Sequence, residues 1–175
     1  LGISLDEMVV WNPFRRLGGN TPDQLRQAKL ILWQGHCSVH TRFTVGQITV
    51  ARERYPDINV IVHPECPMET AQAADLVGST EFIRKTINEA PPGSKWAVGT
   101  EISLVHRLAL NNPDKVVFCL DPVTCPCSTM YRIHPAYVLW VLEGLAEGQV
   151  VNQITVPENI RIEAQVALDR MLALR

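Results

Sequence analysis

The sequence predicts an α/β protein with a parallel sheet. Two observations carry this prediction. Short apolar runs rich in β-branched residues alternate along the chain with segments of helical periodicity, which is typical of βαβ units. Hydrophobic residues also make up 46% of the 175 residues, which is enough to supply a buried core.

Five apolar runs are expected to form strands. They are residues 30–33, 59–62, 75–77, 96–98 and 116–120. Each of the first four is followed by a short polar signature, beginning at Gly35, His63, Gly78 and Gly99. Because right-handed crossovers bring the carboxyl ends of parallel strands to one edge of a sheet, we expect these signatures to converge in space.

Helices are expected between and after these strands. Apolar residues at helical spacing predict helices at residues 45–55, 68–74, 81–88, 102–110, 135–147 and 157–174. Thr21 is a candidate cap for a short helix at 22–29, after a turn-rich opening. An apolar run precedes both Cys37-Ser38 and Cys127-Ser128, which suggests repeated units.

Composition argues against several classes of partner. The 16 Lys and Arg against 18 Asp and Glu give a net charge of −2 without a basic block, so nucleic acid is not an expected partner. No apolar run approaches the roughly 18 residues of a membrane span, and the first residues lack the basic region of a signal peptide. We expect a cytoplasmic protein with no membrane partner, whose five cysteines are reduced thiols or metal ligands.

Candidate site residues follow the expected strands. Cys37 alone fits a buried small side chain, but His40 three residues later favours a site. His63 and Glu65 flank a proline that fixes their relative orientation. They are candidates for a hydrogen-bond donor and an acid/base group, with a helix cap as the structural alternative for His63.

Hydroxyl side chains mark another candidate position. Ser79 and Thr80 stand at an expected helix start, where hydroxyls and free N–H groups can hold an anion. An ordinary N-cap is the alternative for Ser79. Thr100 and Glu101 are expected to be structural.

Three kinds of site compete for these residues. His36, Cys37 and Arg42 suggest a cysteine-phosphatase loop, but only four residues separate Cys37 from Arg42 where that loop has five. A tetrahedral zinc site in an α/β binding module would use Cys37, His40, His63 and Cys66. An iron–sulfur site would use Cys37 and one of Cys119, Cys125 and Cys127.

The chain resembles the quinolinate synthase family from about Met8 to its end. Five motifs agree in order and approximate spacing: residues 33–40, 63–65, 74–80, 98–101 and 127–130. The resemblance implies parallel four-stranded, three-layer αβα units in a pseudo-symmetric arrangement around a 4Fe-4S cluster. This chain would hold one complete unit and parts of its neighbours.

The resemblance also implies an activity. A quinolinate synthase is a transferase that condenses iminoaspartate with dihydroxyacetone phosphate to quinolinate, with loss of phosphate and water, in de novo NAD biosynthesis. The cluster would act as a Lewis acid. A functional link with L-aspartate oxidase or aspartate dehydrogenase is implied as well.

Residue roles follow from the same resemblance. Cys37 and Cys127 would be cluster ligands, with Cys125 as the alternative to Cys127. His63 and Glu65 would be catalytic. The substrate-binding residues would be His40, His63, Glu65, Ser79 and Thr80.

The resemblance further divides the chain. Residues 1–28 would end a preceding αβα unit, and residues 29–115 would form a complete unit that includes Cys37, His63 and Glu65. Residues 116–175 would comprise the third-cysteine loop and C-terminal helices that pack on an N-terminal unit absent from this sequence. That unit would supply the third cysteine ligand, so we expect the chain to be incomplete by itself.

Overall fold

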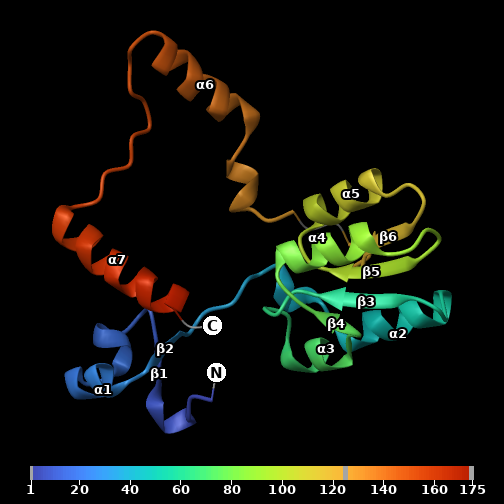
Figure 1. Ribbon diagram of the computed structural model, residues 1–175, viewed down its shortest axis with the longest axis horizontal. Coiled ribbons are helices and arrows are strands. Elements are labelled where there is room, and N and C mark those ends of the chain that lie inside the picture. Colours follow the sequence, from blue (N-terminus) through green and yellow to red (C-terminus); the bar gives the residue numbers. More distant parts are fainter. Residues whose placement is uncertain (1, 124–125, 174–175) are drawn as a thin grey trace. The chain divides into compact units, whose positions relative to one another are not determined.

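The computed structural model describes residues 2–123 and 126–173 (Figure 1). Its contacts divide the chain into two compact units. One unit combines Leu1–Gly35 with Ile133–Arg175, and the other is the continuous segment His36–Arg132. The boundaries expected at residues 28 and 115 stay predictions.

The continuous unit contains a four-stranded parallel sheet, which confirms the predicted α/β class. Its strands are β3 (Asn59–Val62), β4 (Leu76–Val77), β5 (Lys95–Gly99) and β6 (Val116–Cys119). They lie in the order β4-β3-β5-β6, and every neighbouring pair is parallel. The chain therefore changes direction across the sheet between β3 and β5. In open α/β sheets, binding sites form at such a switch point, beyond the carboxyl ends of the strands.

Helices cover both faces of this sheet (Figure 1). Helices α2 (Val45–Arg54) and α3 (Met68–Ala73) cover one face, and α4 (Thr80–Glu89) and α5 (Ile102–Asn111) cover the other. Alternate residues of β3 face opposite layers, since Val60 and Val62 belong to one buried cluster and Ile61 to the second. The unit is thus a three-layer αβα structure.

The other unit contains a short parallel sheet of β1 (Met8–Trp11) and β2 (Leu30–Trp33). They are connected through α1 (Pro22–Gln27), which Thr21 caps by accepting a hydrogen bond from the Gln24 N–H at 3.2 Å. Strand β1 was not predicted. The expectation that residues 30–33 share a sheet edge with the later strands is wrong, because β2 pairs with β1 instead.

The terminal helices of this unit are α6 (Pro135–Ala146) and α7 (Glu158–Ala173). Both were predicted to within one or two residues. None of the helices in the described part of the chain combines the length and hydropathy that a membrane span requires.

The two cysteine loops repeat one local structure. A 3-10 turn follows each cysteine, at His40–Arg42 and at Met130–Arg132. Equivalent backbone N–H groups donate back to each cysteine carbonyl, from Thr41 to Cys37 at 3.1 Å and from Tyr131 to Cys127 at 2.9 Å. Helices α2 and α6 then begin eight residues after their cysteines, capped by Thr44 and His134. The sequence echo therefore corresponds to a structural repeat.

Candidate functional site

The carboxyl ends of three neighbouring strands form the base of the site. The His63 N–H, directly after β3, donates to the Gly99 carbonyl of β5 at 3.0 Å. The Gly78 N–H, directly after β4, donates to the Val62 carbonyl at 3.1 Å. The signatures at His63, Gly78 and Gly99 consequently lie side by side, as the parallel topology predicts.

His40 joins this edge from the loop that follows β2. Its side chain is only 10% exposed. Its Nδ1 lies 2.9 Å from Glu65 Oε2, and its Nε2 lies 3.1 Å from Thr100 Oγ1. An ionised carboxylate only accepts hydrogen bonds, so Nδ1–H donates to Glu65 and the Thr100 hydroxyl donates to Nε2. Both ring nitrogens are thereby engaged, and the ring orientation is fixed.

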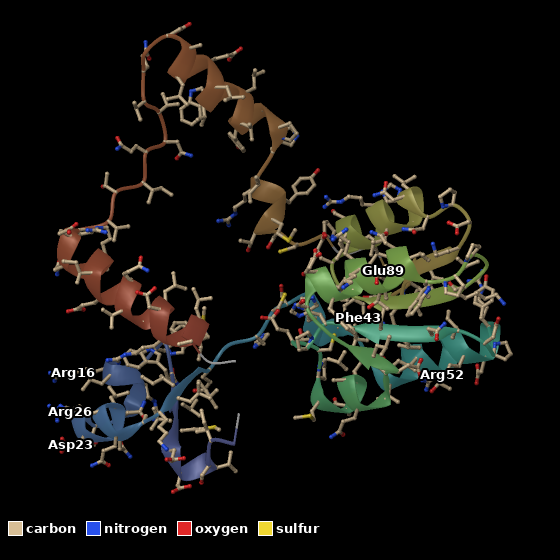
Figure 2. The ribbon with its side chains drawn as sticks, viewed as in Figure 1. Arg16, Asp23, Arg26, Phe43, Arg52 and Glu89 are labelled. Atoms are coloured by element: carbon tan, nitrogen blue, oxygen red, sulfur yellow. The ribbon has the colours of Figure 1, made fainter. Side chains whose placement is uncertain are left out.

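Phe43 anchors the segment that carries His40. It is 2% exposed and packs in the same buried cluster as Val60 and Val62 of β3. Figure 2 shows it against the four-stranded sheet. The Phe43 carbonyl also accepts the Thr70 hydroxyl at 2.9 Å, which ties this segment to α3. Packing on one face of the sheet thus brings His40 to the strand ends.

His63 stacks on His40. The ring centroids are 4.3 Å apart and the planes differ by 8°. The Glu65 N–H donates to His63 Nδ1 at 3.3 Å, which leaves the ring proton on Nε2. Burial and the neighbouring His40 lower the pKa of His63, against a smaller opposing effect of Glu65. His63 is therefore a neutral ring that can donate from Nε2 at neutral pH.

Glu65 connects the two imidazoles to solvent. Its side chain is 57% exposed, and its Oε2 lies 2.9 Å from His40 Nδ1 and 3.7 Å from His63 Nδ1. A carboxylate that touches a fixed imidazole and also reaches water can take up a proton and release it again. The three side chains therefore form a candidate acid/base group.

Cys37 borders this group. Its Sγ and ligand atoms of His40 and Glu65 all lie within 4.8 Å of one another. Cys37 and Cys127 are free, partly buried thiols that pack against the same hydrophobic cluster. Cys125, the alternative ligand, lies outside the described residues.

Cys66 has a different environment. It is buried, and its thiol contacts the Gly99 carbonyl at 3.6 Å. Burial raises the pKa of the Cys66 thiol to about 11. The structure gathers Cys37, His40 and Glu65 in place of the expected zinc set, which included Cys66.

Ser79 and Thr80 begin α4. The Ser79 hydroxyl accepts from the Phe82 N–H at 3.2 Å, so it is an N-cap. Its own proton stays available to a ligand, and the first backbone N–H groups of α4 have no partner inside the helix. Both residues are exposed at the strand end next to His63. Their role as anion contacts stays a prediction.

Sequence reasoning missed two partners in this region. Thr100, expected to be structural, contacts His40. Glu101, also expected to be structural, caps α5 by accepting from the Ser103 N–H at 2.8 Å. Arg42 pairs with the buried Asp121, at 3.0 Å from Nε and 2.9 Å from Nη2. This pairing engages the guanidinium that a phosphatase loop would need. No local signal in the sequence connects residues so far apart.

Comparison with known proteins relates this chain to a single family. The sequence model of the family described as "Quinolinate synthetase A protein" matches residues 2–173. Proteins named "Quinolinate synthase" from Corynebacterium glutamicum and Herpetosiphon aurantiacus are each 59% identical over 174 residues, and one from Geobacillus kaustophilus is 54% identical over 175. These matches cover 99% of this chain but 44%, 46% and 47% of the relatives. The chain thus spans a little under half the length of the relatives it matches.

Proposed function

The chain belongs to the quinolinate synthetase A family, and on this premise we propose that it supplies part of the active site of a quinolinate synthase. The reaction condenses iminoaspartate with dihydroxyacetone phosphate, with loss of phosphate and water, in de novo NAD biosynthesis. This assigns the protein to the transferases of the cytoplasm. An L-aspartate oxidase or aspartate dehydrogenase would supply the imine.

One observation supports this proposal most strongly. His40, His63 and Glu65 form one hydrogen-bonded and stacked group at the switch point of the sheet. The condensation of iminoaspartate with dihydroxyacetone phosphate needs repeated proton transfers at a single position, and this group can perform them.

The cysteines fit the proposed 4Fe-4S cluster. Cys37 and Cys127 are free, partly exposed thiols on loops of matching backbone structure, and soft thiolates are the usual ligands of such clusters. When bound, the cluster would supply a Lewis acid that polarises a substrate oxygen. The third cysteine ligand is expected from an N-terminal unit.

Glu65 is proposed as the proton carrier. The His40 Nδ1–H holds one carboxylate oxygen at 2.9 Å, which fixes the carboxylate, and the exposed side chain returns protons to water. His63 is proposed to donate its Nε2–H to a substrate oxygen, because its Nδ1 is occupied by the Glu65 N–H. Thr100 keeps the His40 ring in the orientation that this arrangement requires.

Ser79 and Thr80 are proposed to hold a substrate anion. The Ser79 hydroxyl proton and the first N–H groups of α4 would bind a phosphate or carboxylate, which the positive end of the helix favours. This position lies at the end of β4, adjacent to His63 at the end of β3. The anion would therefore sit beside the acid/base group.

A chimera tests the proposal. This chain would replace the matching segment of the Corynebacterium glutamicum relative, and the anaerobically purified chimera would be assayed for quinolinate formation, iron and sulfide. We expect quinolinate formation and about four iron and four sulfide per chain. The parent relative is the positive control, and the Cys37→Ser chimera is expected to lose the cluster. A chimera that binds the cluster but forms no quinolinate at any substrate concentration would contradict the proposed activity.

A further inference from the structure

We propose that Cys37, His40 and Glu65 also form a site for a single divalent transition-metal ion of the zinc type, which the cluster-free chain binds. Their ligand atoms lie within 4.8 Å of one another and comprise one sulfur, one imidazole nitrogen and one carboxylate oxygen. Protein zinc sites use this ligand chemistry, and three protein ligands plus water is a common arrangement.

The distances are compatible with a tetrahedral ion. With Zn–S of about 2.3 Å and Zn–N and Zn–O of about 2.0 to 2.2 Å, tetrahedral ligands lie roughly 3.3 to 3.7 Å apart. His40 Nδ1 and Glu65 Oε2 are at 2.9 Å, so this pair must open slightly. The other separations must close by at most about 1 Å. Glu65 can adjust its own separations because its side chain is 57% exposed. The separation between Cys37 Sγ and the His40 nitrogen has to close by rotation of the Cys37 side chain.

Thr100 provides the outer support that such a site needs. Its hydroxyl lies 3.1 Å from His40 Nε2. When Nδ1 binds the metal, the ring proton resides on Nε2 and donates to Thr100 Oγ1, whose hydroxyl turns away. Histidine ligands almost always donate their second ring N–H in this way, which fixes the tautomer and the ring. Stacking on His63 holds the same orientation.

The charges balance as well. Binding releases one proton, from the Cys37 thiol to solvent, while the neutral imidazole changes only its tautomer. Thiolate and carboxylate together then neutralise the dication in a partly buried position. Cys66 lies outside this group of ligand atoms, and its buried thiol contacts the Gly99 carbonyl at 3.6 Å. The geometry therefore selects Cys37 as the sulfur ligand.

Binding of this ion and of the proposed cluster would exclude each other, because both need the Cys37 thiolate. This consequence depends on the proposed function, but binding of the ion does not.

The test is a metal titration of the 175-residue chain, purified free of metal and cluster under anaerobic, reducing conditions. Zn²⁺ affinity is measured against a chromophoric chelator, and Co²⁺ is bound in parallel to detect thiolate coordination by its charge-transfer absorption. We expect one ion per chain with a Cys–cobalt band. Thr100→Val should weaken binding by about 10- to 100-fold. Cys37→Ser should remove the cobalt band, and Glu65→Gln, at an exposed side chain, should weaken binding without affecting folding.

Cys66→Ser and Cys127→Ser are the matched thiol controls, and both are expected to keep the affinity of the parent chain. Absence of stoichiometric binding would overturn the proposal, as would unchanged binding in both Cys37→Ser and Glu65→Gln. Loss of binding in either control variant, with Cys37→Ser unaffected, would assign the metal to other residues. None of these results depends on quinolinate formation, so failure of the metal site and failure of the proposed enzyme are distinguishable.

Discussion

The Arg42–Asp121 ion pair allows a quantitative prediction, because it connects the turn that carries His40 to the loop that precedes Cys127. Asp121 is buried, with one carboxylate oxygen held by Arg42 and the other by the Val123 N–H at 2.9 Å. Arg42 is 40% exposed, so water can replace Asp121 as its partner. Substitution of Arg42 and substitution of Asp121 should therefore lower the free energy of unfolding by different amounts.

Arg42→Ala leaves a buried carboxylate with one remaining donor, and we expect it to lower the free energy of unfolding by about 3 kcal/mol. Asp121→Ala removes the buried charge together with its hydrogen bonds, and should lower the free energy of unfolding by about 2 kcal/mol. Once Asp121 is absent, Arg42 has little left to stabilise. The double variant should therefore be destabilised by about 3 kcal/mol less than the sum of the single variants.

Alkylation of the Cys66 thiol is a suitable assay, since this side chain is 6% exposed and should become reactive when the His36–Arg132 unit opens. Labelling is followed by peptide mass spectrometry in increasing urea, which separates Cys66 from the other cysteines. Thr41→Ala, an exposed neighbour in the same turn, is the control and should change little. If the two single variants had equal and additive effects below about 0.5 kcal/mol, the reasoning would be refuted, and the ion pair would contribute no more than an exposed one.

Three further predictions concern the site. In the chimera, Glu65→Gln should lower quinolinate turnover by about 10²- to 10⁴-fold while iron and sulfide contents stay unchanged; undiminished turnover would remove Glu65 from the mechanism. Because burial lowers the pKa of His63 from 6.5, an NMR titration of this ring should have a midpoint below that value. The unfolded state then binds more protons, so the chain should lose stability as the pH falls from about 6.5 through the folded pKa, and His63→Gln should reduce this loss. Gly99→Ala places a methyl group 2.7 Å from Val62 Cγ1 and should lower the free energy of unfolding, measured by urea denaturation, by about 1 to 3 kcal/mol. Gly46→Ala is the matched control, because its methyl group would make only an ordinary contact with Thr44 Oγ1 at 3.8 Å.

Local patterns predicted most of the fold. The short apolar runs at β2 and β3 match the observed strands residue for residue, since three or four consecutive apolar residues between polar segments are typical of a buried strand. Strand β1 escaped prediction because it is equally short but leads into a turn-rich segment, and only its pairing with β2 reveals it. Long-range pairing leaves no periodic trace in a single sequence.

The structure brings the predicted site residues His40, His63 and Glu65 together, but by a different route from the one expected. The shared edge of β3, β4 and β5 does bring His63, Gly78 and Gly99 together. His40 arrives by another route, through packing of Phe43 on the sheet, because β2 belongs to a different sheet. Thr100 was not recognised because a hydroxyl 60 residues from its partner carries no local signal.

The continuity of the His36–Arg132 unit has a consequence for biosynthesis. Every residue of the acid/base group lies inside one uninterrupted segment, whereas the other unit is assembled from the two ends of the chain. Domains generally fold as they leave the ribosome, so the first can complete its contacts once Arg132 has emerged, while the other unit also contains residues that are synthesised later. A nascent chain stalled shortly after that point would already carry an ordered His40, His63 and Glu65.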